Sequence, residues 1–294
     1  MSAEVVCLGV VTVDTVALVE RYPSEDERVL AQEIVRGGGG PAAVAAVALS
    51  RLGISTAIVG TIGDDEDGAF VRNIFDREGI NHEGLSLSSS PTSGSVIVAS
   101  REHSSRAIST RQPVQQAPLN SAAKNLINHA TWIHVDHVGI TRLGEAGIAR
   151  GQGPKISFDA GYGVEKFDAS LVDLFAPTDR MMDLRHPGKS LETALRADFH
   201  ENIVVATRGS RGSAGFSKAD GYVQARGFAI DVVSTLGAGD VFHGALLAQI
   251  IQGRPLSEAL HRANAVAALS CRGLDGQSAI PTTKELENFL KEQR

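Results

Sequence analysis

Short apolar runs alternate with amphipathic stretches along most of the chain. Such runs are typical of buried strands, and the amphipathic stretches are typical of helices packed against them. The runs predict strands at Val5–Val13, Thr56–Gly60, Trp132–Val135, Lys155–Asp159 and Ile203–Thr207. The amphipathic stretches predict helices at Ala42–Leu52, Asp67–Glu78, Gly239–Gln252, Leu256–Arg272 and Thr283–Glu292. This alternation predicts an α/β fold with a mainly parallel sheet covered by helices on both faces.

Two stretches, Arg28–Arg36 and Gly94–Ile108, break this rhythm, because both alternate like short strands and have no helical pattern nearby. We expect them to form a small separate sheet over the carboxyl ends of the main strands, where open α/β sheets bind ligands. The sequence therefore predicts a lid, with segments at about 14–36 and 91–113. Nothing repeats internally and no linker divides the chain, so residues 1–294 are expected to form a single domain.

Composition excludes several classes of partner. The 28 Lys and Arg residues face 34 Asp and Glu residues, and no basic block is present, so nucleic acid is not expected as a partner. Glu4 stands where a signal peptide carries basic residues, and no apolar run is long enough for a membrane span. We expect a cytoplasmic protein without membrane contact. Cys7 and Cys271 lie in apolar runs and are expected to be buried thiols.

The segment Val233–Leu247 carries the strongest chemical signal. Gly237, Ala238 and Gly239 open a helix, so their backbone N–H groups can face one point at the positive end of the helix dipole and bind an oxyanion or phosphate. Asp240 follows directly, where a carboxylate can take the proton of a hydroxyl that attacks phosphorus. Gly and Asp are also ordinary helix-capping residues, so this segment alone leaves both interpretations open.

His134, Asp136 and His137 suggest a metal site at first sight. Strand alternation places His137 on the opposite face from the other two, so a shared metal site is not expected.

Two regions resemble one known family. Gly38-Gly39-Gly40-Pro41-Ala42-Ala43 with Val47–Gly53 and Gly60–Gly68 looks like the N-terminal signature of the PfkB (ribokinase-like) carbohydrate kinases. Ser234–Asp240 resembles their C-terminal signature, and Thr207–Gly212 and the helix around Asn264 follow the family's order. The resemblance implies a ribokinase-like three-layer α/β/α fold with a small β-sheet lid.

Within the family, the Gly-Gly-Gly-Pro-Ala-Ala sequence and the Val-Phe-His-Gly sequence after Asp240 are most similar to the sulfofructose kinase branch. That branch is expected to hold a sulfonate with an arginine after the central strand, whereas this chain has Asp136-His137-Val138-Gly139. The resemblance therefore implies a sugar or modified sugar, such as a sulfofructose, fructose-like or ribose-like compound, and does not fix which one.

The resemblance also implies roles for matching residues. Asp240 would be the base on the sugar hydroxyl, and the N–H groups of Gly237, Ala238 and Gly239 would stabilise the transferring phosphoryl group. Contacts to the sugar are expected from Asp14, Gly38, Gly39, Gly40 and Asp136, and contacts to the nucleotide from Thr207, Gly209, Gly212, Asn264 and Gly273. The alternatives are a turn-forming role for Asp14, a tight helix entry for the glycines and a plain surface position for Asn264.

The chain also departs from the family's pattern. Ser234 replaces the aspartate associated with a monovalent-cation site, so activation by potassium is not expected. The usual Asn-x-x-Glu segment that organises magnesium is matched by Met182–Gly188, where Asp183 is the one carboxylate available. Val44 stands where an asparagine is common, which makes the sugar pocket less polar.

The favoured interpretation is an ATP-dependent sugar kinase that uses Mg²⁺, with a homodimer formed through the lid. The alternative is a non-catalytic or regulatory sugar- or nucleotide-binding relative. A nucleotide-cofactor oxidoreductase is a poor fit, because no Gly-x-Gly-x-x-Gly follows a strand.

Overall fold

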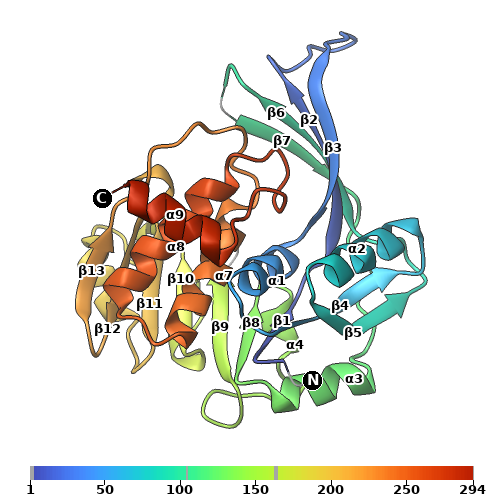
Figure 1. Ribbon diagram of the computed structural model, residues 1–294. Coiled ribbons are helices and arrows are strands. Elements are labelled where there is room, and N and C mark those ends of the chain that lie inside the picture. Colours follow the sequence, from blue (N-terminus) through green and yellow to red (C-terminus); the bar gives the residue numbers. More distant parts are fainter. Residues whose placement is uncertain (1–2, 104, 162–164, 294) are drawn as a thin grey trace.

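The computed structural model describes residues 3–103, 105–161 and 165–293. Within these residues, a nine-stranded sheet has the order β13-β12-β11-β10-β9-β8-β1-β4-β5 (Figure 1). The run from β11 to β5 is parallel throughout, and β12 and β13 add antiparallel at one edge. The strands are β1 Val5–Leu8, β4 Thr56–Gly63, β5 Asn81–Ser88, β8 Trp132–Val135, β9 Lys155–Ala160, β10 Leu174–Pro177, β11 Ile203–Thr207, β12 Ser213–Ser217 and β13 Gly221–Ala225.

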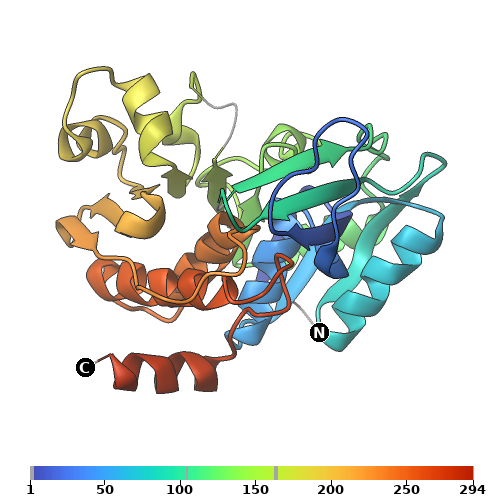
Figure 2. The same cartoon turned by 90° about the horizontal axis from the view of Figure 1, so that it is seen from above.

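Helices cover both faces of this sheet, as Figure 2 shows from above. In β1, Val5 and Cys7 point into one core, and Val6 and Leu8 point into the other, because successive strand residues face opposite sides. The first core is covered by α1 Pro41–Arg51, α2 Glu66–Arg77, α7 Ala238–Ile251, α8 Leu256–Ser270 and α9 Thr283–Glu292. The second is covered by α3 Ser121–His129, α4 Gly139–Arg142, α5 Asp179–Arg185 and α6 Leu191–Ala197. The predicted three-layer α/β/α fold is confirmed.

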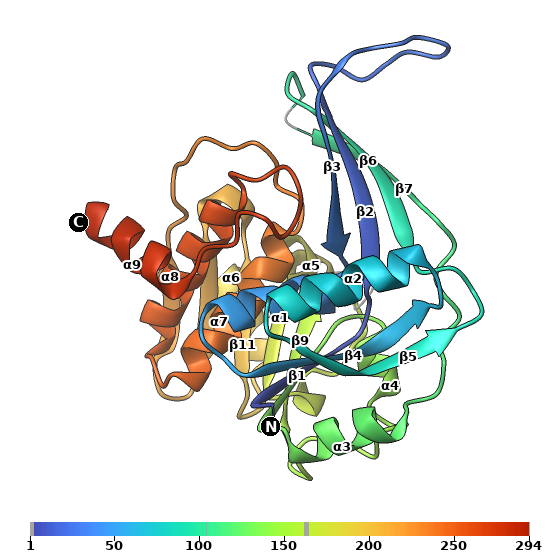
Figure 3. The ribbon, with the colours of Figure 1, turned by 45° about the vertical axis from the view of Figure 1, so that its right-hand side comes forward.

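A separate four-stranded sheet projects from the carboxyl side of the main sheet (Figure 3). Its order is β3-β2-β6-β7, with β2 Thr12–Val19, β3 Ala31–Gly39, β6 Gly94–Ser100 and β7 Ser105–Thr110. Buried residues on its inner face form a small core with Leu274: Val16, Leu18, Ile97 and Ala99. The predicted lid sheet is present, although residue 104 of its second segment lies outside the described residues.

The prediction of one strand over Val5–Val13 is wrong. β1 ends at Leu8, and the chain leaves the main sheet to begin lid strand β2 at Thr12. A side chain at Gly9 would lie 2.3 Å from the carboxylate of Asp136, and Oδ2 of Asp136 accepts the N–H of Val10 at 2.7 Å. These contacts take the chain out of the ladder, so Asp14 belongs to the lid.

Helix α7 is buried on nearly every side, from Val241 to Gln249. It lies between α1, α8 and the sheet, and a helix that is apolar all round requires such a position. This packing fixes its N-terminus at the carboxyl ends of the strands. No helix in the described part of the chain is long and apolar enough to cross a membrane.

Candidate active site

The N-terminus of α7 has the geometry of an anion-binding turn. Gly237 caps the helix with φ 72°, in the left-handed region that favours glycine, and a Cβ there would lie 3.0 Å from Cα of Gly276. The N–H of Ala238 donates to the carbonyl of Thr235 at 3.3 Å, so it is already used within the turn. In the described part of the chain, the N–H groups of Gly237 and Gly239 have no such partner. Two of the three predicted donors are therefore open to an anion.

Asp240 lies in the first turn of α7, directly after these N–H groups. Burial raises its pKa to about 8, the negative charges of Asp159 and Asp136 act in the same direction, and His243 opposes them. A carboxylate with a pKa close to the working pH is suited to accept a proton from a hydroxyl. The position and the pKa both fit the predicted role of a base.

A pocket of about 330 Å³ opens onto this turn. Ala238 and Gly239 line one end of it. Four of the residues predicted to contact the nucleotide line the same pocket: Thr207, Gly209, Gly212 and Asn264. The fifth, Gly273, is not among the lining residues and packs against Ser278 and Ala279. The structure thus joins the predicted nucleotide segments to the anion-binding turn in one cavity.

Asn264 lines this pocket and holds a neighbouring loop by hydrogen bonds. Its buried side-chain amide donates to the carbonyl oxygens of Ala225 at 3.1 Å and Arg226 at 3.2 Å. These bonds hold the chain just before Gly227 and Phe228, which also line the pocket. Asn264 therefore shapes the cavity through the loop that it holds.

The residues predicted to contact the sugar gather where β2 and β3 leave the main fold. Asp14 pairs with Gly37 across the two strands, and a Cβ on Gly39 would lie 2.0 Å from Oδ2 of Asp14. Gly38 belongs to the same strand end, and Gly40 is the N-cap of α1. Burial raises the pKa of Asp14, partly offset by hydrogen bonds from Ser95 and Thr12. The glycine at position 39 is what lets this carboxylate lie against β3.

One loop connects this corner to the anion-binding turn. A Cβ on Gly37 would lie 3.1 Å from Asp275, and a Cβ on Gly237 would lie 3.0 Å from Gly276. The lid glycines and the start of α7 therefore lie on either side of the same short segment. The segment Asp275–Gly276 therefore lies between the lid strands that carry Asp14 and the start of the helix that carries Asp240.

Asp136 is placed at the site but is already fully engaged. Oδ2 accepts the N–H groups of Val10 and Ala42 at 2.7 and 3.3 Å, and Oδ1 accepts those of Val138 and Gly139 at 2.9 Å each. Four backbone donors thus occupy the carboxylate that was predicted to contact sugar. Asp136 joins the ends of β1 and β8 to the start of α1, and its predicted sugar contact stays a prediction.

The predicted magnesium residue Asp183 lies exposed on α5. The carboxyl end of β10 leads instead into Thr178, the N-cap of α5, and into Asp179, which forms an ion pair with Arg211. Within the described residues, no group of three or more His, Cys, Asp or Glu side chains is arranged to hold a metal ion. These residues do not form an all-protein magnesium cage, and they fit an ion that arrives with nucleotide phosphates and keeps several waters.

Three residues of the site were missed by the sequence analysis. Arg106 of lid strand β7 lines the nucleotide pocket, and its Nη1 donates to Oγ1 of Thr235 at 3.0 Å. Asp159 and His243 form a buried pair beside Asp240. Alternation along β7 puts Arg106 and the apolar Ile108 on the same face of the strand, which is a weak signal. No local signal joins Asp159 to His243.

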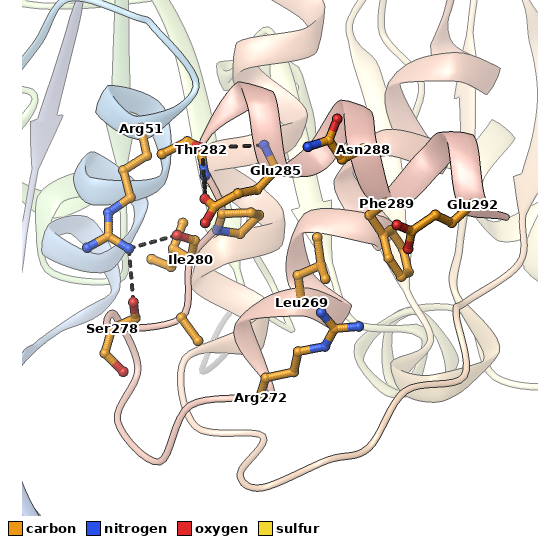
Figure 4. A pocket seen from close by; sticks show the side chains of 12 residues that line it. Arg51, Leu269, Arg272, Ser278, Ile280, Thr282, Glu285, Asn288, Phe289 and Glu292 are labelled. Atoms are coloured by element: carbon orange, nitrogen blue, oxygen red, sulfur yellow. Dashed lines mark hydrogen bonds between the residues drawn. The ribbon is translucent and has the colours of Figure 1, made fainter.

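A second pocket, of about 580 Å³, lies between α8, α9 and the end of α1 (Figure 4). None of the predicted site residues line it. Arg51 at its edge donates to the carbonyls of Ser278 and Ile280 and pairs with Glu78. This arginine anchors the loop that separates Gly37 from Gly237, so the pocket supports the site from behind.

Comparisons with known proteins agree with this arrangement. The family model described as "pfkB family carbohydrate kinase" matches residues 2–283. The chain belongs to this family. It is therefore a carbohydrate kinase, a phosphotransferase whose acceptor is an alcohol group.

This pfkB-family kinase has curated relatives along its whole length. It is 28% identical to an ATP-dependent ribose-1-phosphate kinase of Halopiger xanaduensis, covering 98% of each chain. It is 25% identical to a ribokinase of Haemophilus influenzae, covering 97% of each. Among solved structures, the ribokinase of Arabidopsis thaliana in complex with ribose and ATP has a TM-score of 0.78 at 21% identity, over 99% of both chains. The fold is ribokinase-like.

Proposed function

We propose that this kinase transfers the γ-phosphoryl group of ATP to a hydroxyl of a sugar or modified sugar, with Asp240 as the base. The observation that carries the proposal is the single cavity that joins Thr207, Gly209 and Gly212 to the first turn of α7. A nucleotide lying along that cavity would direct its terminal phosphate at the open N–H groups of this turn.

In the proposed reaction, the acceptor hydroxyl lies between Asp14 and Asp240. Its proton passes to the carboxylate of Asp240, its oxygen bonds to the γ-phosphorus, and the bond from that phosphorus to the bridging oxygen breaks to release ADP. The N–H groups of Gly237 and Gly239 and the guanidinium of Arg106 would stabilise charge on the phosphoryl oxygens.

Magnesium is proposed as the ion that accompanies ATP, as in an Escherichia coli protein of the ribokinase II type that was solved with ATP and Mg²⁺. When bound, it would neutralise charge on the terminal phosphates. The exposed Asp183 and the Arg211-paired Asp179, both on α5 after β10, are the carboxylates that would contact its water shell in this proposal.

The acceptor is proposed only as a class. The lid corner offers one carboxylate, Asp14, and backbone groups of the glycine run Gly38–Gly40. Such donors and acceptors suit vicinal hydroxyls of a small sugar. The sequence resemblance to the sulfofructose kinase branch keeps sulfosugars in this class beside ribose-like and fructose-like sugars.

A panel assay tests this proposal. Sugars, sugar phosphates, sulfosugars and nucleosides are incubated with MgATP, and ADP formation is measured with and without each acceptor. We expect at least one sugar class to raise ADP formation far above the acceptor-free rate, and Asp240→Asn to abolish that gain. If no acceptor raised the rate above that of Asp240→Asn, the proposal would be wrong.

We also propose that a homodimer forms through the outer face of the lid. Ala17 pairs with Ile34 on one side and Val98 on the other, and Ile34 and Val96 are 66% and 59% exposed. An exposed apolar row on a small sheet is a typical protein contact surface. Sedimentation of the parent and of Ile34→Glu tests this, and a monomeric parent would contradict it.

A further inference from the structure

A His–Asp pair lies next to the proposed base, Asp240. His243 follows Asp240 by three residues on α7, so both side chains lie on the same side of the helix. Nδ1 of His243 lies 2.7 Å from Oδ2 of Asp159, near the carboxyl end of β9. Both side chains are buried, with 5% and 8% of their surfaces exposed. A buried His–Asp pair beside a catalytic carboxylate affects the charge of that carboxylate.

The surroundings favour the charged form of His243. Burial lowers its pKa, but Asp159, Asp240 and the carbonyl of Ala176 outweigh burial and raise it above the ordinary value. A neighbouring ring, His134, lies 6.5 Å away between centroids, and burial lowers its pKa to about 4. The surroundings therefore favour opposite states of the two rings, the charged form in His243 and the neutral form in His134.

Asp240 receives opposing influences from this pair. The titratable groups that face it are Asp159 on β9, His243 on α7 and Asp136 after β8. Asp159 and Asp136 favour its protonated form, as does burial, and His243 alone favours the carboxylate. Without a cation at this place, the protonated form of the base, which cannot accept a proton, would be favoured still further.

We propose that the His243–Asp159 pair is a positioning device for the reaction, in which Asp159 holds the imidazolium of His243 so that its charge stabilises the proton-free carboxylate of Asp240. This inference rests on the proposed role of Asp240 as the base. His243 keeps its proton throughout: the hydroxyl proton moves to Asp240, and no proton is taken from the ring.

The two members of the pair have opposite charges, so their removal should change the pH profile to different extents. His243→Asn removes the cation, and the pKa of Asp240 should rise. Because activity needs the carboxylate, the acid limb of the kcat–pH profile then moves to higher pH, by about one unit or more. Asp159→Asn removes a negative charge that raises the pKa of Asp240, but it also removes the partner that favours the charged form of His243. These two effects oppose each other, so the limb should move less than in His243→Asn.

A matched control is available on the surface. Nε2 of His82 on β5 lies 2.9 Å from Oδ1 of Asp76 on α2, in a His–Asp pair that does not line the nucleotide pocket. His82→Asn should leave the pH profile unchanged. KM for ATP should stay within a few-fold in all variants, since the pair does not line the nucleotide pocket.

A second measurement needs no variant in the cluster. In NMR spectra of the parent with ¹⁵N-labelled histidine, we expect one ring to titrate at a higher pH than the exposed histidines. Another ring should stay neutral down to a pH well below that at which the exposed histidines titrate. If no ring titrated above the exposed group, the proposed cation would be absent and the inference would be overturned.

The outcomes separate this inference from the proposed function. If Asp240→Asn loses turnover but His243→Asn and Asp159→Asn lower kcat equally at every pH, Asp240 remains the base and the pair is merely structural. If Asp240→Asn keeps its rate, the proposed function itself fails. A displacement of the acid limb to higher pH in His243→Asn that is larger than in Asp159→Asn supports the inference.

Discussion

The first turn of α7 and the lid strand β2 each present a carboxylate to the proposed site, but on different supports. Asp240 stands on a helix that is buried between α1, α8 and the sheet. Asp14 stands on a four-stranded sheet with a small core, whose edge strand β7 is exposed along its whole length. Close packing such as that around α7 keeps a catalytic group fixed, whereas a lightly packed sheet can open and close.

The difference suggests a division of labour. The proposed base, Asp240, lies on the closely packed helix together with the anion-binding turn. The residues proposed to contact the sugar lie on the lightly packed lid sheet, and closure of that sheet would exclude water from the γ-phosphate. Substitutions on the helix and on the lid test this division.

Asp240→Asn should lower kcat by about 10²–10⁴-fold, because the amide keeps the shape of the side chain but cannot accept a proton. Nucleotide affinity, measured by calorimetric titration, should change little. Asp231→Asn, an exposed carboxylate shortly before the helix, is the control and should leave kcat unchanged. Turnover within a few-fold of the parent would rule out Asp240 as the base.

Gly39→Ala should raise KM for the sugar by about 10–100-fold, since a Cβ 2.0 Å from Oδ2 of Asp14 must displace that carboxylate and its hydrogen bonds. Gly144→Ala is the control, because nothing lies within 4 Å of its Cβ position. Steady-state kinetics with the verified sugar measure both. An unchanged KM in Gly39→Ala would mean that Asp14 does not contact the sugar.

Arg106→Ala should lower kcat/KM for ATP by about tenfold, the worth of one charge-assisted hydrogen bond to a phosphate. Arg101→Ala removes a cation from the same lid hairpin that bonds to Gln32 and does not line the nucleotide pocket. The two variants should therefore differ. Equal losses would show that only the general charge of the lid matters.

Replacing sodium with potassium at matched ionic strength should leave the rate unchanged. Ser234 brings no charge to the position of the family's aspartate, and its Oγ already accepts the N–H of Leu236 at 3.2 Å. Initial rates in the two salts measure this. A strong activation specific to potassium would show that backbone carbonyls alone complete a cation site.

Much of the fold was predictable because hydrophobic residues recur at regular spacings in its strands and helices. α9 was predicted at Thr283–Glu292 and lies there, and α7 and α8 differ from prediction by two residues or fewer at each end. β5, with the polar sequence Asn81–Ser88, has no continuous apolar run and was not predicted. The break after Leu8 was missed because it depends on Asp136, distant in sequence.

The site was predictable where it lies in one stretch of chain, as at Gly237–Asp240. Its other parts depend on contacts between distant elements. His243 and Asp159 are 84 positions apart, and they meet only because α7 packs over the end of β9. Arg106 reaches Thr235 only when the lid lies over the turn. Neither contact can be predicted from the residues that are adjacent in the sequence.

The central claim is that α7 performs the chemistry and the lid selects the sugar. The most direct test measures kcat and the sugar KM side by side in Asp240→Asn and Asp14→Asn. We expect Asp240→Asn to lose kcat with KM within a few-fold of the parent, and Asp14→Asn to raise KM with kcat within a few-fold of the parent. The same pattern of change in both variants would contradict it.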